Sequence, residues 1–322
     1  MEKNTLTKLE NTFEEDVYKG LTSYPKKLSS KYFYDEKGDK IFQQIMEMPE
    51  YYLTNAEYEI IDTYTPALAE IFKDEEKGFD LIELGAGDGK KTKILLQYLT
   101  KNNYKFSYLP IDISKHALLD LKTTLKKEFP QLEVVPKQGT YLDVLHELNE
   151  FKHRKKVIMM LGSNIGNMVH ENAISFMQGI QKSMHKQDLL FMGFDQKKHP
   201  KKIIKAYSDK TGITEAFNKN ILVRINNELD ANFNPDKFIQ WESYNPETGT
   251  AKSFLVATEP QTVFIRKMNL HVDFDAWETI HTEISQKYDL KTIDWIAGQV
   301  NLKIVNQYTD AQQLFKNFLF AI

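Results

Sequence analysis

Short apolar runs alternate with amphipathic segments between residues 79 and 195. Five runs are long enough for buried strands: FDLIELGAG, FSYLPIDIS, LEVVPKQG, KKVIMMLGSNIG and DLLFMGFD. Between them, Lys90 to Leu99 and Lys115 to Phe129 are predicted helices. Strands that alternate with helices indicate βαβ units and a mostly parallel sheet buried on both faces. The expected fold class is therefore α/β.

The segments on either side of this core follow other patterns. Residues 39–48 predict a helix that Pro49 stops, and Thr54 to Glu57 reads as a capping box that opens the next helix. Residues 200–285 mix helices with β-type runs (FIQWESYN, AKSFLVATE, QTVFIRKMNLHV). After residue 285, a short helix and the runs LKIVNQYTD and FKNFLFAI predict a strand pair that returns to the main sheet. We therefore expect one domain from residues 61–198 and 286–322, and a second from 1–60 and 199–285.

Composition narrows the function. The longest uncharged run, residues 157–169, is too short and too polar to span a bilayer, and no secretory signal is visible. We therefore expect a cytoplasmic protein with no membrane partner. The absence of cysteine excludes disulfides, thiolate catalysis and cysteine-ligated zinc. The eight histidines form no H-E-x-x-H motif, so no metal is expected. A net charge of −3 with only three arginines argues against nucleic acid as a partner.

The strongest local signal is LIELGAGDGKKT, residues 81–92, in which a strand ends in glycines and a helix follows at once. Such a loop lets the backbone approach a ligand and presents free N–H groups at the helix start. A phosphate-binding P-loop would need glycine at position 84 and Ser or Thr at 91, where Leu84 and Lys91 stand. A dinucleotide fingerprint would need a glycine in place of Lys90. The remaining interpretation is a loop for S-adenosylmethionine (AdoMet). Glu83 supplies the acid that precedes its first glycine, and Asp112 ends the next strand, placed to bind a ribose.

Two further motifs could contact a substrate. LGSNIGNM, residues 161–168, follows the fourth strand, where ligands bind in open parallel sheets, although a purely structural turn explains it equally well. In His281-Thr282-Glu283-Ile284-Ser285, alternation on a strand would place His281, Glu283 and Ser285 on one face. An exposed polar face is the simpler explanation of that alternation.

The chain closely resembles the histidine-specific Nα-methyltransferases of ergothioneine biosynthesis, a class I AdoMet-dependent family. The similarity runs from KKLSSKYFYDEKGDKIFQQIMEMPEYYLTNAE through LIELGAGDGKKT, LPIDIS, LGSNIGNM and AYSDKTGITEAFNKNIL to HVDF and TEIS. It implies a Rossmann-like methyltransferase domain with a C-terminal strand pair, and a second α+β substrate-binding domain. It also implies transfer of three methyl groups to the α-amine of L-histidine, giving hercynine and S-adenosylhomocysteine, by a monomer.

The resemblance also assigns site residues. It implies AdoMet contacts at Tyr34, Gly85, Gly87, Lys91, Asp112, Thr140 and Tyr141, with Lys91 on the cofactor carboxylate and Asp112 on the ribose. It implies substrate contacts at Tyr51, Gly162, Asn167, Tyr207, Glu283 and Ser285. Of these residues, Tyr34 and Asn167 would act on the reacting amine and are the expected catalytic residues. Glu283 and Ser285 would bind the imidazole nitrogens.

Two positions depart from the family pattern. Thr140 stands where the family carries an acid near the adenine, and Ser253 stands where a methionine often lines the ring pocket. A smaller, polar residue at 253 could admit a bulkier ring, so the same chemistry on tryptophan or a derivative is the nearest alternative. A nicotinamide-dependent oxidoreductase and a catalytically silent AdoMet-binding regulator are the alternatives from other classes.

Overall fold

A computed structural model describes residues 12–139 and 153–322 of the protein. The chain separates into two units, which are described one at a time. The first unit contains the chain up to Tyr51 and His199–Ser285, and the second contains Tyr52–Lys198 and Gln286–Ile322. The N-terminal boundary therefore falls after Tyr51 and not after residue 60 as expected, because α3 (Tyr52–Phe72) is one continuous helix of the second unit.

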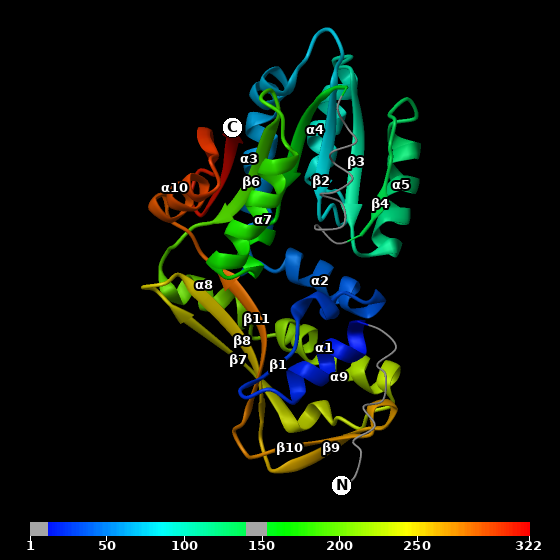
Figure 1. The fold of residues 1–322 in the computed structure, drawn as a ribbon, viewed down its shortest axis with the longest axis vertical. Coiled ribbons are helices and arrows are strands. Elements are labelled where there is room, and N and C mark those ends of the chain that lie inside the picture. Colours follow the sequence, from blue (N-terminus) through cyan, green and yellow to red (C-terminus); the bar gives the residue numbers. More distant parts are fainter. Residues whose placement is uncertain (1–11, 140–152) are drawn as a thin grey trace. The chain divides into compact units, whose positions relative to one another are not determined.

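The second unit is built on one seven-stranded sheet. Its strands are β2 (Phe79–Leu84), β3 (Phe106–Asp112), β4 (Lys137–Gln138), β5 (Lys155–Met160), β6 (Leu189–Asp195), β12 (Lys303–Thr309) and β13 (Phe315–Ala321). They lie in the order β12-β13-β6-β5-β2-β3-β4 (Figure 1). β2 to β6 pair in parallel, whereas β13 is antiparallel to both β6 and β12. The predicted α/β class, the mostly parallel sheet and the C-terminal strand pair are confirmed.

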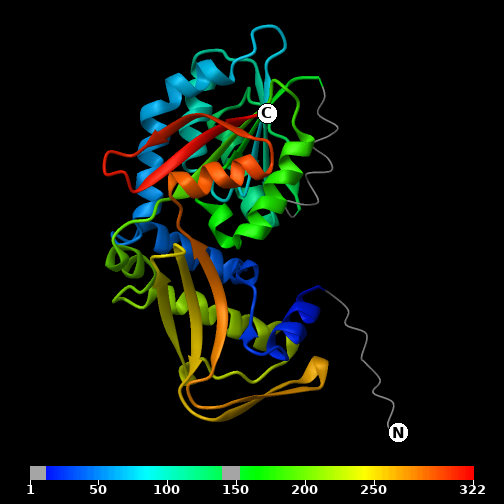
Figure 2. The ribbon, with the colours of Figure 1, turned by 60° about the vertical axis from the view of Figure 1, so that its left-hand side comes forward.

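Helices cover both faces of this sheet. They are α3, α4 (Thr92–Lys101), α5 (Lys115–Glu128), α7 (His170–Ser183) and α10 (Leu290–Gln299). Apolar side chains of α7 and α10 form one core cluster with side chains of β2, β5, β6 and β13. Figure 2 shows α3 and α4 on the opposite face of the sheet. The central strands are thus buried on both sides, and every residue of β2 and β6 is buried, which explains why most of their residues are apolar.

One predicted strand is much shorter than expected. The run LEVVPKQG contributes only the two-residue β4 and one isolated bridge between Val134 and Tyr108. Pro136 interrupts the run, and because proline has no N–H to give to a ladder, it confines pairing to short stretches. The third strand of the prediction is therefore a sheet edge.

The first unit combines a second sheet with helices. Its strands β1 (Lys26–Lys27), β11 (Thr279–Gln286), β8 (Thr250–Ala257) and β7 (Phe238–Asn245) lie in that order, and β9 (Gln261–Ile265) pairs with β10 (Leu270–Phe274) as a separate ribbon (Figure 1). Its helices are α1 (Thr12–Leu21), α2 (Glu36–Glu47), α8 (Pro200–Tyr207) and α9 (Ile213–Leu229). Apolar side chains of α1, α2, α9 and the strands share one core. The mixture of helix and strand expected for residues 200–285 is confirmed.

The run QTVFIRKMNLHV is a hairpin and not one long strand. Its two halves are β9 and β10, joined by the short turn Arg266–Met268 and by Asn269 in the left-handed conformation (φ 46°). Asparagine tolerates that conformation better than most residues, and this signal was available in the sequence. In residues 12–139 and 153–322, no helix is long and apolar enough to cross a bilayer.

Candidate functional site

The glycine loop follows β2 and leads into α4, as its sequence predicts. Gly85 and Gly87 both have positive φ, 76° and 52°, a conformation that side chains with a Cβ rarely adopt. The Gly85 N–H donates to Ile111 O at 2.8 Å, which fixes the loop against the end of β3. A Cβ placed on Gly87 would meet no atom within 4 Å. The loop is therefore tied to the sheet at Gly85 and leaves open space at Gly87, which fits the approach of a ligand.

Asp112 ends β3 beside this loop. Its carboxylate accepts hydrogen bonds from the Gly87 N–H at 2.9 Å and from the Ser114 N–H at 2.9 Å. The structure therefore brings together Asp112 and Gly87, two of the residues expected at the cofactor. A carboxylate has about four acceptor positions, so these two bonds leave Asp112 able to accept from ribose hydroxyls.

Glu83 lies beneath the loop and not in it. Its carboxyl group is buried on β2 and accepts hydrogen bonds from Thr92 Oγ1 at 2.6 Å and from the Tyr108 hydroxyl. Burial raises the pKa of Glu83 to about 7, against partial lowering by these two hydrogen bonds. The acid that precedes the first glycine thus joins β2, β3 and the start of α4, and supports the loop from below.

Lys91 stands at the start of α4, and its ammonium pairs with Glu57 of α3. Glu57 is fully buried and also accepts from the Gly162 N–H at 2.6 Å. We expected Glu57 to close a capping box with Thr54. That prediction is wrong, because α3 already begins at Tyr52 and the carboxylate turns toward the sheet instead. Glu57 is one of the residues near the candidate site that the sequence did not reveal, since only the fold brings it to Lys91.

The loop after β5 carries two more of the expected residues. Gly162 has a φ of 74°, and a Cβ there would lie 3.6 Å from Lys91 Nζ, so the lysine ammonium lies against this loop. Ser163 is left-handed (φ 56°), and its hydroxyl accepts from the Asp195 N–H at 2.9 Å. The short turn Asn164–Asn167 follows and leaves Asn167 exposed. Gly162, Lys91 and the glycine loop therefore share the carboxyl edge of the second unit's sheet.

In the first unit, two expected substrate residues meet directly. The Tyr207 hydroxyl and Ser285 Oγ lie 2.9 Å apart, although 78 positions separate them in the chain. The Tyr51 ring packs edge-on against Tyr207, with centroids 6.1 Å apart. Glu283 lies two residues before Ser285 on β11 and is half-buried. The weak alternation in the sequence thus leads, at Ser285, to a defined contact between α8 and β11.

The other expected tyrosine of this unit belongs to the same aromatic row. The ring of Tyr34 contacts Phe42 edge-on at 5.4 Å, and Phe42 contacts Tyr51 at 6.3 Å. Phe217 of α9 packs against both Tyr34 and Phe42. Tyr34, Phe42, Tyr51 and Tyr207 therefore form one continuous row of rings, in which Phe42 is a member that the sequence did not single out.

Ser253 is buried on β8 and does not stand alone. Its hydroxyl hydrogen-bonds the carboxylate of Glu242, its partner on β7, which is also buried. The Thr282 hydroxyl donates to Ser253 O at 3.1 Å, so this polar group lies beside the T-E-I-S segment. The small side chain at 253 therefore binds a second buried carboxylate that the sequence did not reveal.

Several expectations and features lie elsewhere. Thr140 and Tyr141 fall outside the described residues.

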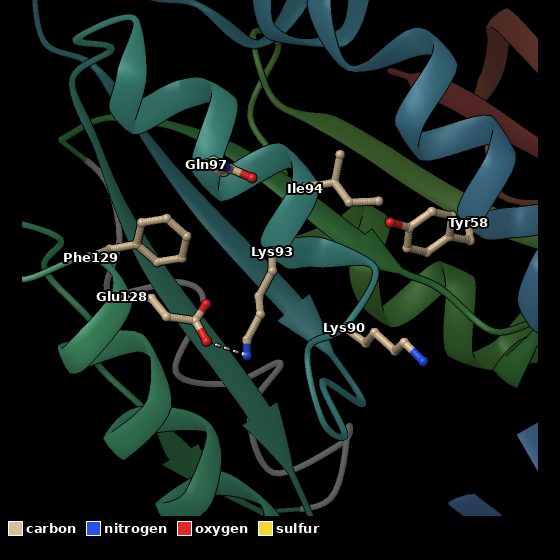
Figure 3. A pocket seen from close by; sticks show the side chains of 7 residues that line it. All are labelled: Tyr58, Lys90, Lys93, Ile94, Gln97, Glu128 and Phe129. Carbon is tan, nitrogen blue, oxygen red and sulfur yellow. Dashed lines mark hydrogen bonds and ion pairs between the residues drawn. The ribbon is translucent and has the colours of Figure 1, made fainter. Parts of the chain in front are cut away.

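A cavity of about 420 Å³ lies beside α4 in the second unit, and Figure 3 shows the Lys93–Glu128 ion pair (3.0 Å) on its wall. It is lined by Tyr58, Lys90, Lys93, Ile94, Gln97, Glu128 and Phe129, none of which was expected at the site. Within the described part of the chain, no group of three His, Asp or Glu side chains could hold a metal ion.

Comparisons with known proteins identify the family of the chain. Residues 13–322 match the family model described as "Histidine-specific methyltransferase, SAM-dependent". The chain is 32% identical to the histidine N-alpha-methyltransferase of Mycobacterium tuberculosis, over 92% of this chain and 90% of the relative. It is 27% identical to ergothioneine biosynthesis protein 1 of Schizosaccharomyces pombe, over 87% of this chain and 37% of the relative. It is 26% identical to the 4-dimethylallyltryptophan N-methyltransferase easF of Claviceps purpurea, over 88% and 87%. The family model matches nearly the whole chain, and so this protein belongs to the histidine-specific, AdoMet-dependent methyltransferases.

Proposed function

We propose that this enzyme adds three methyl groups in succession to the α-amine of L-histidine, giving Nα,Nα,Nα-trimethylhistidine (hercynine). The observation that carries the proposal is the 2.9 Å contact between the Tyr207 hydroxyl and Ser285 Oγ, which joins two residues expected to bind the amino acid. The family match and the mycobacterial relative support histidine as the substrate. The fungal relative, named for ergothioneine biosynthesis, fits a trimethylated product.

The second unit would hold the cofactor. When bound, AdoMet supplies a methyl group carried on a positively charged sulfur. The open space at Gly87 admits a ligand close to the backbone, and Asp112 retains acceptor positions for ribose hydroxyls. Lys91 would bind the carboxylate of the cofactor's amino-acid group. Since alignment at roughly 3–3.5 Å and exclusion of water account for much of the rate of such a displacement, rigid anchoring of the donor is the main requirement.

The histidine contacts described here would come from five side chains. Asn167 and Tyr207 would bind the substrate carboxylate, and Asn167 together with Tyr34 would orient the α-amine. Glu283 and Ser285 would hydrogen-bond the imidazole nitrogens. A carboxylate in a binding pocket strongly favours a ring that donates an N–H, so phenylalanine would be rejected.

The number of methyl groups follows from the chemistry of the amine. A neutral amine has a lone pair, and so do its mono- and dimethylated products, so each can react again. The trimethylated product is a quaternary ammonium without a lone pair, and the reaction stops there. The amine can lose its proton to water between steps, so a dedicated general base is not required.

Calorimetry and mass spectrometry test the proposal together. Titration of L-histidine into the protein saturated with S-adenosylhomocysteine should give binding. Incubation with AdoMet should give products heavier by one, two and three methyl groups, with the last accumulating. No methylated histidine at any AdoMet concentration would refute the substrate, and accumulation of a mono- or dimethylated end product would refute trimethylation.

The second candidate is N-methylation of tryptophan or a derivative. The small side chain of Ser253 and the likeness to the 4-dimethylallyltryptophan enzyme favour it. The Ser253 hydroxyl, however, hydrogen-bonds the carboxylate of Glu242, and a buried carboxylate does not favour an apolar ring beside it. A competition assay over aromatic amino acids separates the two candidates, because preference for tryptophan would overturn histidine as the substrate. The monomeric state and the cytoplasmic location stay predictions.

A further inference from the structure

Glu57 is a fully buried carboxylate that the proposed chemistry does not use. Burial of an isolated carboxylate is strongly unfavourable unless a cation and hydrogen-bond donors surround it. Here the Lys91 ammonium supplies the opposite charge, the Gly162 N–H donates at 2.6 Å and Asn317 Nδ2 donates at 2.9 Å. These three groups therefore form a binding site for one negative charge.

The partners of Glu57 come from separate parts of the second unit. Lys91 opens α4, Gly162 lies in the loop after β5, and Asn317 lies on β13. Gly193 of β6 provides the room, because a Cβ there would lie only 2.2 Å from Glu57 Oε1. A single side chain of α3 thus connects the helix that follows the glycine loop with the loop after β5.

The charge of Glu57 acts on Lys91 in particular. The lysine side chain is 20% exposed, so its ammonium is neither free in solvent nor closed off from a ligand. An ammonium has three N–H donors, and the pair with Glu57 occupies one of them. Lys91 can therefore bind a ligand carboxylate while it stays attached to Glu57, and it need not become ordered when the ligand arrives.

We propose that Glu57 is a positioning residue for the cofactor: it holds the Lys91 ammonium and the Gly162 N–H in place, so that Lys91 meets the carboxylate of the cofactor's amino-acid group. The inference rests on the role proposed above for Lys91. It predicts that Glu57 affects ligands that carry this carboxylate and not ligands that lack it.

Glu57→Gln tests the charge with little change of shape. An amide oxygen can still accept from Gly162, while the new NH2 group would face Asn317. Asn317 Oδ1 is buried without a hydrogen-bond partner, so a rotation of the Asn317 amide would supply an acceptor for that NH2 group. The variant therefore loses the ion pair with Lys91 and can keep its other hydrogen bonds.

Two ligands separate positioning from general damage. Calorimetry should show S-adenosylhomocysteine bound about tenfold more weakly by Glu57→Gln, a loss of about 1.4 kcal/mol. The affinity for 5′-methylthioadenosine, which shares the adenosine but lacks the amino-acid group, should stay within twofold. Unchanged or tighter binding of S-adenosylhomocysteine, or equal weakening of both ligands, would overturn the proposal.

Further variants complete the design. In the Lys91→Met background, Glu57→Gln should cause no further loss of S-adenosylhomocysteine affinity, whereas additive losses would show that Glu57 does not act through Lys91.

Glu57→Asp keeps the charge but is shorter by one methylene. It serves as a second variant if the Glu57→Gln protein does not fold, and the same selective loss is expected. Asp62→Asn removes a charge from an exposed position of α3 and is the matched control. Neither ligand requires histidine to be the substrate, so failure of the proposed function would leave this result interpretable.

Discussion

Glu83, a single residue beside the glycine loop, makes the stability of the folded protein depend on pH. Its pKa is raised to about 7 from an ordinary value of 4.5, chiefly by burial. The folded protein therefore keeps a proton over an interval of pH in which the unfolded chain has lost it. The stability from this group is fully present below about pH 4.5 and is lost as the pH rises through 7.

Glu83→Gln should remove this pH dependence, because the amide stays neutral at every pH. We expect the free energy of unfolding of the wild type to fall more between pH 5 and pH 8 than that of the variant. Each unit of pKa difference corresponds to about 1.4 kcal/mol. Denaturant unfolding at the two pH values measures the effect, and parallel changes in the two proteins would contradict it.

Glu283 is the residue whose substitution should separate activity from stability. It is half-buried on β11, so its loss leaves no large cavity in the core. If it binds the imidazole as proposed, Glu283→Ala should lower kcat/KM for histidine by about ten- to a hundredfold, since hydrogen bonds to a charged group are worth about 1.5–3 kcal/mol. The melting temperature should change by only a few degrees. A matching fall in activity and stability would show that Glu283 is structural.

At the scale of elements, the N-terminus of α9 is stabilised by Asp209, four positions before the helix begins. Asp209 accepts hydrogen bonds from the Ile213 N–H at 3.1 Å and the Thr214 N–H at 2.8 Å, at the N-terminus of this helix. Burial alone would raise the pKa of Asp209, but hydrogen bonds from Thr211 and Thr214 hold it well below its ordinary value. The carboxylate is therefore a helix cap that is charged at neutral pH.

Asp209→Ala should lower the free energy of unfolding by about 1–2 kcal/mol, because it leaves N–H groups of the first turn without an acceptor. Asp209→Asn keeps an acceptor oxygen and should lose less. Because the folded pKa is depressed, the contribution is present above the ordinary value of 3.8 and disappears as the pH falls below it. Denaturant unfolding near neutral pH and again in acid measures both effects, and an equal loss in the two variants would argue against capping.

The strands at the centre of the second unit's sheet were predicted well from their apolar residues. The runs that became β2, β3, β5 and β6 are mostly buried and rich in apolar residues, and so they could be recognised without the structure. The prediction was wrong where local chemistry overrides the apolar run. Pro136 shortened the third strand to β4, and Asn269 turned a single run into the β9–β10 hairpin.

On the scale of the whole molecule, the second unit contains a buried cluster of charged side chains. The residues of this cluster lie close in sequence to the points at which the chain passes from one unit to the other. The Asp195 carboxylate accepts from the Tyr52 hydroxyl at 2.9 Å and pairs with Lys198 and with Lys287, the last at 2.8 Å. Tyr52, Lys198 and Lys287 are each within two residues of a boundary between the units. Burial alone would raise the pKa of Asp195, but the two lysines hold it below its ordinary value.

Asp195→Asn should be among the most damaging substitutions outside the site. It leaves two lysines beside a neutral amide, and loss of one partner of a buried ion pair costs about 3–5 kcal/mol. Denaturant unfolding measures the loss. Glu128→Gln, which breaks the partly exposed pair with Lys93, is the comparison and should change stability little. A loss no greater than that of the comparison would show that the cluster does not stabilise the unit.

The sequence by itself determined the class of fold, the glycine loop and, through resemblance, the family, because strand and helix periods and the glycine spacing are local properties. Only the tertiary structure decided how residues distant in the chain combine. It paired Lys91 with Glu57, Ser285 with Tyr207 and Ser253 with Glu242. A buried carboxylate must find its partners in three dimensions, since its cost is met by charges and N–H groups from other segments. No pattern within α3 or β7 predicted that the carboxylates of Glu57 and Glu242 would pair with residues expected at the site.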